Sequence, residues 1–442
     1  MRRNLLAAAG GALTGLAAPS RADAALLRAD AALLRADAAL LRADAAGLRA
    51  DAAPARKRVR TGMDRMAAAK WAALAGERVG VVANLTAVDR DYRHLVDLMH
   101  ADGVTIAAIF GPEHGFRGSA PAGGDEGIGA DPRTGLRVYD GHLATLDGWT
   151  KMFTEAGVTT VVFDIQDVGA RFYTYIWTLF DSMAAAAAMN LRYLVLDRPN
   201  PIGGRARGPM LKPGFASAIG KKEIVQQHGM TIGELARLYR GEWLPKVRLE
   251  VIECAGWHGG LFAADTDVPW VMPSPNMPTP DTALVYAGTC LFEGVSSLSE
   301  GRGTTRPFEL AGAPGLDFHW RDRLAGLDLP GVVFREAYFE PRVGKFADQL
   351  CVGVEVRVSD PETFDPVGTA TAMLIEAKRY PGFAWRTDPW PVPHFVDKLA
   401  GSDRYRTMID AGAPLAEVTG AWADELAAFE RRRKPYLIYP RP

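Results

Sequence analysis

A glutamate and a histidine stand side by side where an apolar stretch of the sequence ends. Glu113 and His114 follow residues 104–110, a run typical of a buried strand, and a Gly-Pro pair separates the two features. A carboxylate at such a strand end, between glycines that let a substrate approach, is suited to general-acid catalysis, and His114 can orient it or share its proton. Arg117 is a substrate-binding candidate. The structural alternative is that Arg117 pairs with Glu113 and clamps the loop.

Two more apolar runs end in polar clusters of the same kind. Residues 158–165 and 191–197 are strand-like, and acidic, amide and arginine side chains follow each of them. The members of the two clusters are Asp164, Gln166, Asp167, Arg171, Asp197, Arg198 and Asn200. One such acid alone is usually a helix cap or a turn residue. Because neighbouring parallel strands end at the same edge of a sheet, we expect the three clusters to converge on a ligand site there.

A glycine-rich loop in the second half of the chain carries another concentration of charge. Residues 296–310 contain Glu300, Arg302, Thr304 and Arg306. Guanidinium groups and hydroxyls there are a natural surround for an anionic or polyhydroxylated ligand. The loop lacks the spacing of a phosphate-binding loop, and no GxGxxG follows a strand, so a nucleotide cofactor is disfavoured. The structural alternative is a plain ion pair between Glu300 and Arg302.

Aromatic and histidine side chains add candidates for substrate contact. Tyr173 belongs to a cluster of four aromatic residues, and aromatic faces stack on sugar rings, although at helical spacing at least two of the four must be core. His228 precedes a predicted helix and is a binding candidate or a turn residue. The eight histidines show no HExxH or short HxH spacing, so the sequence predicts no metal site. A GxSxG nucleophile elbow is also absent, which weakens an α/β-hydrolase interpretation.

The elements that must position these residues alternate between strands and helices. Apolar runs without polar alternation predict strands covered on both faces, and amphipathic stretches between them predict helices. The predicted strands are residues 78–86, 104–110, 158–165, 191–197 and 247–254, and the predicted helices are residues 92–101, 146–156, 172–189 and one with Thr231 as N-cap and Glu234 three residues on. This order predicts an α/β fold with a doubly wound parallel sheet.

A proline-rich segment divides the predicted elements into two groups. Residues 269–283 contain five prolines and cannot form a regular helix or an interior strand. They predict a boundary between an N-terminal catalytic domain, residues 59–265, and a smaller α/β domain, residues 266–442. A stiff path over an active site would have the same composition. The predicted elements of the second domain are residues 283–291, 332–339, 349–358 and 369–379, with a helix-rich tail over 422–431.

The N-terminus is typical of an exported protein. Arg2 and Arg3 precede an apolar stretch too short to span a bilayer, and Ala22-Asp23-Ala24 matches an AxA cleavage site. We expect residues 1–24 to be a twin-arginine-like signal, or an ordinary secretory one, and the protein to be periplasmic or extracellular without stable membrane insertion. The RADAALL repeats within residues 25–58 predict a helical or disordered linker; a recent duplication or a start placed too early in the reading frame also accounts for them.

The composition narrows the classes of partner. The 442 residues are 48% hydrophobic with a net charge of −1, a balance typical of a globular protein that binds neither nucleic acid nor anionic membranes. The three cysteines are widely spaced in apolar runs, so we expect buried thiols rather than a disulfide framework.

Five ordered motifs resemble those of the exo-β-N-acetylmuramidase family of glycoside hydrolases, over roughly residues 78–442. The motifs are GPEHGFRG, FDIQDVGARFYTY, LDRPNPIGG, PSPNMPTPDTA and EGVSSLSEGRGTTRPFEL. Only the RADAALL array has no place in that pattern. The resemblance implies a cleft between a Rossmann-like domain and a smaller C-terminal domain, and release of terminal β-1,4-linked N-acetylmuramic acid from the non-reducing ends of peptidoglycan fragments. By the same resemblance Glu113 is the leading catalytic carboxylate, and Asn276 is a further substrate-binding candidate.

The residues and the resemblance together predict a glycosidase without metal or cofactor. In this mechanism Glu113 protonates the leaving oxygen, and Glu300 or Asp164 acts as base or stabilises the transition state. Arg302 or Arg306 binds the lactyl carboxylate of N-acetylmuramic acid, which N-acetylglucosamine lacks. Two other functions stay open. One is a periplasmic binding protein for muramyl saccharides without catalysis, and the other is an ester or amide hydrolase that uses Glu113 and His114.

Overall fold

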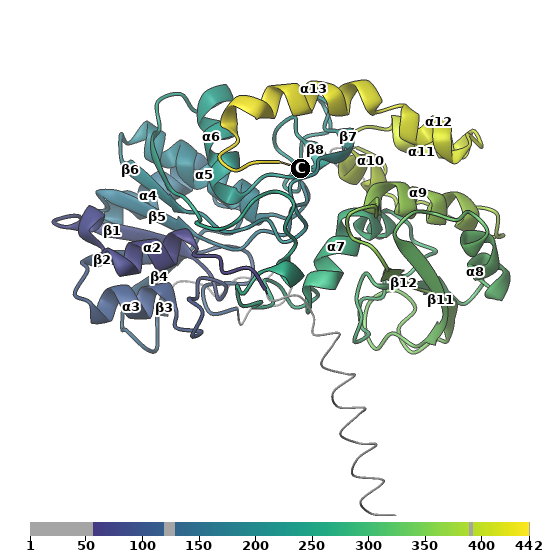
Figure 1. Ribbon diagram of the computed structural model, residues 1–442, viewed down its shortest axis with the longest axis horizontal. Helices are drawn as coiled ribbons and strands as arrows, with labels where there is room; N and C mark the ends of the chain where they lie inside the picture. The colour runs from purple at the N-terminus through teal and green to yellow at the C-terminus, as the bar shows by residue number, and fades with distance from the viewer. Residues whose placement is uncertain (1–55, 119–128, 389–391, 442) are drawn as a thin grey trace, which may run out of the picture. The chain divides into compact units, whose positions relative to one another are not determined.

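The five apolar runs predicted as strands in the first half of the chain lie in one seven-stranded sheet (Figure 1). The computed structural model describes residues 56–118, 129–388 and 392–441. The strands are β1 (Val79–Ala83), β2 (Ile106–Gly111), β3 (Gly129–Ala130), β4 (Arg137–Asp140), β5 (Thr160–Asp164), β6 (Arg192–Leu196) and β9 (Arg248–Ile252). Neighbouring strands pair in parallel, except that β3 runs antiparallel to β4 at one edge. The predicted parallel sheet is therefore confirmed.

The order of the strands places three of the predicted polar clusters at one edge. The sheet order is β3-β4-β2-β1-β5-β6-β9, so the chain goes from β1 to β2 on one side and later returns to β5 on the other. Ligands of open parallel sheets bind at the carboxyl edge beside such a reversal. Because β2, β5 and β6 all end at this edge, the sheet brings the segments after them together.

Alternate residues of the strands pack against helices on opposite faces of the sheet. Val81 belongs to a core that includes α2 (Gly62–Ala68) and α3 (Leu95–Ala101). Val82 belongs to the larger core, which includes α4 (Leu146–Ala156), α5 (Tyr175–Ala188) and α6 (Ile232–Glu242). Because helices cover both faces of the sheet, its strands lack the alternation of polar and apolar residues that is typical of a sheet with one exposed face.

The starts of the helices follow from local sequence. Thr231 caps α6 as predicted, because its hydroxyl accepts from the backbone N–H of Glu234 while the Glu234 carboxylate accepts from that of Thr231. Helix α4 has the predicted bounds. Helix α5 begins at Tyr175 instead of residue 172, so that Phe172 and Tyr173 lie in the loop before it.

The proline-rich segment ends inside a helix. Helix α7 (Pro280–Thr289) has Pro280 in its first turn, where a missing backbone N–H removes no helical hydrogen bond. The prediction that residues 269–283 cannot form a regular helix is therefore wrong for the end of the segment. It holds for the part before Thr279, the N-cap.

The second half of the chain contains a smaller, antiparallel sheet. Strands β10 (Leu310–Ala313), β12 (Cys351–Val358) and β11 (Val332–Phe339) pair in that order. Helices α8 (Phe318–Ala325) and α9 (Pro366–Ala377) contribute buried side chains to the core beside it. The runs at 332–339, 349–358 and 369–379 were predicted as elements of this region. The domain boundary after residue 265 stays a prediction, since residues 56–442 cluster as one compact unit.

Most of the remaining elements are short and were not predicted from the sequence. They are β7 (Arg207–Met210), which pairs with β8 (Val225–Gln227), the helices α10 (Phe395–Ala400), α11 (Arg404–Asp410), α12 (Leu415–Gly420) and α13 (Ala423–Arg433), and the 3₁₀ helices η1 (Ala72–Leu74), η2 (Ala263–Asp265), η3 (Cys290–Gly294) and η4 (Lys434–Tyr436). Helices α2 and α8 and strands β3, β4, β7, β8 and β10 were not predicted. Of the tail, only the stretch that forms α13 was expected to be helical.

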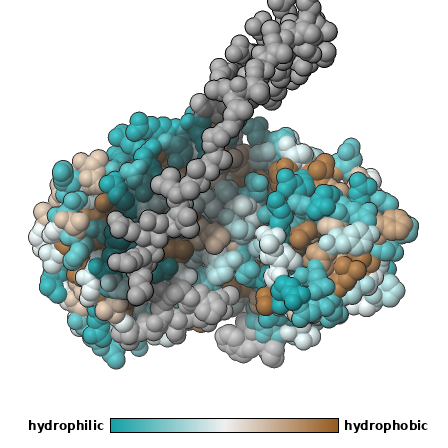
Figure 2. All heavy atoms as spheres, turned by 90° about the horizontal axis from the view of Figure 1, so that it is seen from below, coloured by the Kyte–Doolittle hydropathy of each residue, from teal (hydrophilic) through white to brown (hydrophobic). Residues whose placement is uncertain are grey.

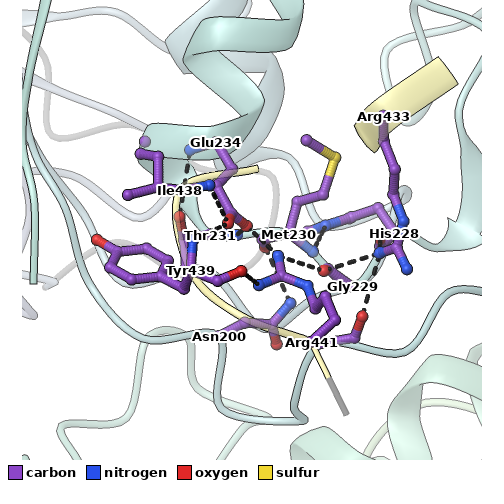
Figure 3. A network of polar contacts seen from close by, with 12 residues as sticks. Asn200, His228, Gly229, Met230, Thr231, Glu234, Arg433, Ile438, Tyr439 and Arg441 are labelled. Atoms are coloured by element: carbon purple, nitrogen blue, oxygen red, sulfur yellow. Dashed lines mark hydrogen bonds and ion pairs between the residues drawn. The ribbon is translucent and has the colours of Figure 1, made fainter. Parts of the chain in front are cut away.

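The C-terminal segment returns to the domain of the parallel sheet, where hydrogen bonds and an ion pair hold it. Helix α13, yellow in Figure 1, leads back towards α6. The backbone N–H groups of Ile438 and Tyr439 donate to the buried Glu234 carboxylate at 2.8 and 3.2 Å, and Arg441 pairs with the same carboxylate (Figure 3). Arg433 donates to the carbonyls of His228 and Gly229. These contacts attach the C-terminal segment to α6 and to the loop before it.

The surface and the cysteines show little that is unusual. On the face seen in Figure 2, apolar residues are scattered among hydrophilic ones. No helix in the described part of the chain is long and apolar enough to cross a membrane, and no group of His, Cys, Asp or Glu there is arranged to hold a metal ion. The three cysteines are free and buried, as predicted.

Candidate active site

One pocket collects residues that lie far apart in the sequence. It is a cavity of about 150 Å³ that starts at the residues after β2 and reaches the glycine-rich loop before β10. Five of the predicted site residues line it: Glu113, His114, Tyr173, Asn276 and Arg302. The other lining residues are Phe172, Thr174, Tyr175, Ile219, Ser274, Pro275, Met277, Tyr286, Cys290, Glu293, Phe308, Phe395 and Leu399. The proline-rich segment thus runs along this pocket.

Glu113 is held by a hydrogen bond from the segment before α5. The Thr174 hydroxyl donates to Oε2 of Glu113 at 2.6 Å, and Thr174 is itself the residue that precedes the first turn of α5. His114 is buried and has a φ of 71°, the left-handed conformation that non-glycine residues rarely adopt. Such backbone conformations persist only where the surroundings fix them, and they are frequent in active sites.

Aromatic rings form one wall of the pocket. The Tyr286 ring meets Tyr173 and Phe308 edge to face, at centroid distances of 5.8 and 4.7 Å. Burial raises the pKa of the Tyr173 hydroxyl, so that it stays protonated and able to donate. Tyr175 donates to the carbonyl of Pro273 and so ties the proline-rich segment to α5. A ring-lined wall with a polar group suits a sugar.

Arg302 is the arginine of the glycine-rich loop that lines the pocket. It donates to Oε1 of Glu293 at 2.6 Å, and its guanidinium lies 4.9 Å from the centre of the Phe308 ring. The neighbouring Gly303 has a φ of 82°, and a Cβ there would lie 2.3 Å from the carbonyl oxygen of Val343. Only glycine fits that turn, which sets the course of the loop around Arg302.

The other predicted residues of this loop lie outside the pocket. Glu300 is 4% exposed and is held by Lys345, at 2.8 Å, and by Arg302, at 3.5 Å. Arg306 pairs with Glu309 at 2.7 Å, and the Thr304 hydroxyl donates to the carbonyl of Gly301. Glu300 therefore supports Arg302 from behind the pocket wall. This agrees with the structural alternative for this loop, an ion pair between Glu300 and Arg302.

Asp164, the other predicted second acid, is part of the scaffold under the sheet edge. It is fully buried and forms a two-point ion pair with Arg198, in which the Nη2 to Oδ2 distance is 2.9 Å. Arg198 also donates to the carbonyl of Val88 at 3.1 Å. The pair joins the ends of β5 and β6 to the loop after β1, and Asp164 does not line the pocket.

The other predicted residues after β5 and β6 hold these loops together. Gln166 donates to the carbonyl of Pro199 at 2.9 Å, and Asn200 donates to that of Met230, also at 2.9 Å. His228 accepts from the backbone N–H of Met230 through Nδ1, so its proton is on Nε2, which donates to Asp167 at 3.1 Å. The segments after the three strands do lie together. Most of their polar side chains, however, form hydrogen bonds within and between these loops and do not line the pocket.

Two arginines that were predicted to bind substrate form hydrogen bonds or ion pairs outside the pocket. Arg171 is fully buried and donates to the carbonyls of Pro209, Ile224 and Leu399, and burial lowers its pKa to about 9. Arg117 pairs with Asp131 and Asp97, each at 2.9 Å. Neither lines the pocket, and Arg171 instead joins α10 to the strands β7 and β8.

Asp197 lies beneath the C-terminal segment instead of in the pocket. Its carboxylate accepts from the hydroxyls of Thr231 and Tyr439 and from the backbone N–H groups of Arg198 and Gly233. Complete burial raises its pKa to about 7, against the hydrogen bonds, which lower it. The folded state therefore holds a proton here that the unfolded chain has already lost above pH ~4.

This difference predicts how stability depends on pH. Because the raised pKa favours the protonated, folded form, the Asp197 contribution to the free energy of unfolding is complete below pH ~4 and decreases as the pH rises towards ~7. The difference in unfolding free energy between the wild type and Asp197→Asn should fall by up to about 4 kcal/mol across this range. Urea denaturation of both proteins from pH 4.5 to 8 measures it. A difference that is independent of pH would contradict the raised pKa.

Several pocket residues were not predicted from the sequence. Glu293 precedes the glycine-rich loop and Phe308 lies within it. Both belong to the motif EGVSSLSEGRGTTRPFEL, so their types gave a usable signal. Tyr286, on α7, and Leu399, on α10, come from segments that look like ordinary core helices. Only the folded chain brings those two to Glu113.

Comparisons with known proteins cover nearly the whole described chain. Residues 79–281 match the model of the N-terminal domain of exo-β-N-acetylmuramidase NamZ, and residues 284–439 match that of its C-terminal domain. The peptidoglycan β-N-acetylmuramidase NamZ of Bacillus subtilis (strain 168) is 40% identical over 389 residues, which are 87% of this chain and 92% of the relative.

Solved structures agree with this match. Two crystal structures of DUF1343 family proteins from Bacteroides fragilis superpose with TM-scores of 0.80 and 0.70 at 30% and 31% identity. They cover 86% and 87% of this chain and 99% of each solved chain. With both domain models matched and this degree of identity, the chain belongs to the NamZ family of exo-β-N-acetylmuramidases.

Proposed function

We propose that this protein is an exo-acting glycoside hydrolase that releases terminal β-1,4-linked N-acetylmuramic acid from the non-reducing ends of peptidoglycan fragments. The reaction takes place in the pocket at the carboxyl edge of the parallel sheet, where Glu113 acts as the general acid. The observation that carries this proposal is the meeting of Glu113, an aromatic wall and Arg302 in one cavity. A carboxylic acid beside rings that can stack on a sugar is the arrangement that protonation of a glycosidic oxygen requires.

Arg302 accounts for the choice of N-acetylmuramic acid. It is the arginine among the described residues that line the pocket, and its Nη1 has no hydrogen-bond partner among them. The lactyl carboxylate of the substrate can bind there through a charge-assisted hydrogen bond worth about 1.5 to 3 kcal/mol. Arg306, the alternative from the sequence, lies outside the pocket and pairs with Glu309.

A pair of chromogenic substrates tests this function. The purified protein should cleave a β-N-acetylmuramide faster than the matching β-N-acetylglucosaminide, by about tenfold to a hundredfold in kcat/KM. Arg306→Gln serves as a matched control, because it removes a nearby guanidinium outside the pocket and should leave the preference unchanged. Equal cleavage of both substrates would contradict the role of Arg302. Tight binding of the muramide without release of the chromophore would instead support a binding protein.

We also propose that the protein acts outside the cytoplasm, in the periplasm or beyond it. The support is the sequence of residues 1–24, with Arg2-Arg3, an apolar stretch and an AxA site, which lie outside the described residues. An enzyme that trims wall fragments would meet its substrate there. Expression of the full chain followed by fractionation and N-terminal sequencing of the mature protein tests this proposal. Retention of residues 1–24 in a cytoplasmic product would contradict it.

A further inference from the structure

The two acids predicted from the sequence as partners of Glu113 are both used by the scaffold. Asp164 is fully buried in its ion pair with Arg198, and Glu300 is held by Lys345 and Arg302 behind the pocket wall. Glycoside hydrolysis by a pair of carboxyl groups needs a second one that reaches the sugar. Among the described residues that line the pocket, Glu293 is the carboxylate other than Glu113.

We propose that Glu293 is the second catalytic carboxylate. This inference rests on the proposed function and adds to it the group that faces the reacting carbon. Glu293 belongs to η3, which follows α7 directly, so it enters the pocket from the opposite half of the chain to Glu113.

The position of Glu293 is fixed from two sides. On one side, Arg302 donates to its Oε1 with Nη2 at 2.6 Å and with Nε at 3.3 Å. On the other, the neighbouring Gly294 packs so closely against α10 that a Cβ there would lie 2.5 Å from Cβ of Val396. A carboxylate held in one orientation is what a catalytic group requires.

The two oxygens of Glu293 differ in their surroundings. Oε1 accepts both hydrogen bonds from Arg302, whereas Oε2 has no hydrogen-bond partner among the described residues. Arg302 is in turn supported by Glu300 and by the Phe308 ring. Burial disfavours the charged guanidinium, but the two glutamates outweigh it and raise the pKa of Arg302. This permanent cation holds Oε1 of Glu293, and Oε2 remains available to the substrate.

In the proposed reaction the two carboxyl groups have different roles. Glu113 gives its proton to the glycosidic oxygen, the bond from that oxygen to C1 breaks, and the bonding electron pair stays with the leaving sugar. Glu293 neutralises the positive charge that develops at C1, as an ion pair or a covalent ester. Water then supplies hydroxide to C1, and its remaining proton goes to Glu113, which restores the general acid. The net reaction consumes one water and needs no other reactant.

Two substitutions at this position, together with azide, test the role. Glu293→Gln keeps the side-chain shape and an oxygen for Arg302, and should lower kcat/KM on a chromogenic β-N-acetylmuramide by about 10²–10⁴-fold while the melting temperature changes little. Glu293→Ala should be equally slow, and sodium azide should restore its turnover by attacking C1 in the vacated space. The product should then be muramyl azide, detected by mass spectrometry. A residue that only supports the fold would not give this product.

Glu376→Gln is the matched control. Like Glu293, Glu376 accepts from an arginine, Arg323 at 3.0 Å. It is buried on α9 away from the pocket, so its replacement should keep wild-type activity. Near-normal turnover of Glu293→Gln, or a folded Glu293→Ala that azide does not rescue, would overturn the proposal. Absence of muramide cleavage by the wild type would instead reject the proposed function, so the two failures are distinct.

Discussion

Replacing Glu113 with glutamine is expected to lower kcat/KM for muramide cleavage by about 10²–10⁴-fold, the usual contribution of a general acid. Glutamine keeps the shape of the side chain and an oxygen that accepts from Thr174, but it has no proton to give to the leaving sugar. The fold should be unaffected, and the KM should change less than kcat because the loss falls on the transition state. Steady-state kinetics with the chromogenic muramide, and a melting curve of the variant, measure both effects.

Glu77→Gln is a suitable control for this experiment. The Glu77 carboxylate also accepts from a threonine hydroxyl, that of Thr159, at the same distance of 2.6 Å as the bond between Glu113 and Thr174. It precedes β1 and thus lies at the amino end of the sheet, away from the pocket. The control should keep full activity. Wild-type turnover in Glu113→Gln would remove Glu113 from the mechanism.

The largest effect on stability is expected at the buried pair of Arg198 and Asp164. Arg198→Met removes the partner of a carboxylate that is fully buried, and should lower the free energy of unfolding by about 3 to 5 kcal/mol. The cause is the uncompensated charge of Asp164 more than the lost contact. Chemical denaturation of the wild type and the variant at neutral pH measures the loss.

A double substitution separates stability from catalysis at the same position. Asp164→Leu combined with Arg198→Met removes both charges and should recover much of the lost stability, because an apolar pair of similar volume often replaces a buried ion pair at little cost. Since Asp164 lies outside the pocket, the double variant should also cleave the muramide with a kcat close to that of the wild type. Loss of turnover in a stable double variant would return Asp164 to the list of catalytic acids.

Residue types and spacing predicted some residues of the candidate site correctly and others wrongly. Glu113 and Arg302 were predicted because each stands in a glycine-flanked polar motif, and both line the pocket. Asp164 and Asp197 stand in motifs of similar appearance, yet they are buried in hydrogen-bond networks of the scaffold. A strand-end carboxylate looks the same in sequence whether it faces a ligand or a neighbouring arginine. The difference depends on which side chain the adjacent loop brings to it.

The sequence by itself determined the parallel sheet, the start of α6 and the strand end that carries Glu113. These features depend on local preferences, such as apolar runs without polar alternation and a capping box, which act over a few residues. Only the tertiary structure decided which acids share a cavity. Glu293 and Glu113 are 180 positions apart in the chain, and their meeting follows from how η3 packs against α10 and how Arg302 is turned by its loop. Long-range contacts of this kind leave no periodic trace in a single sequence.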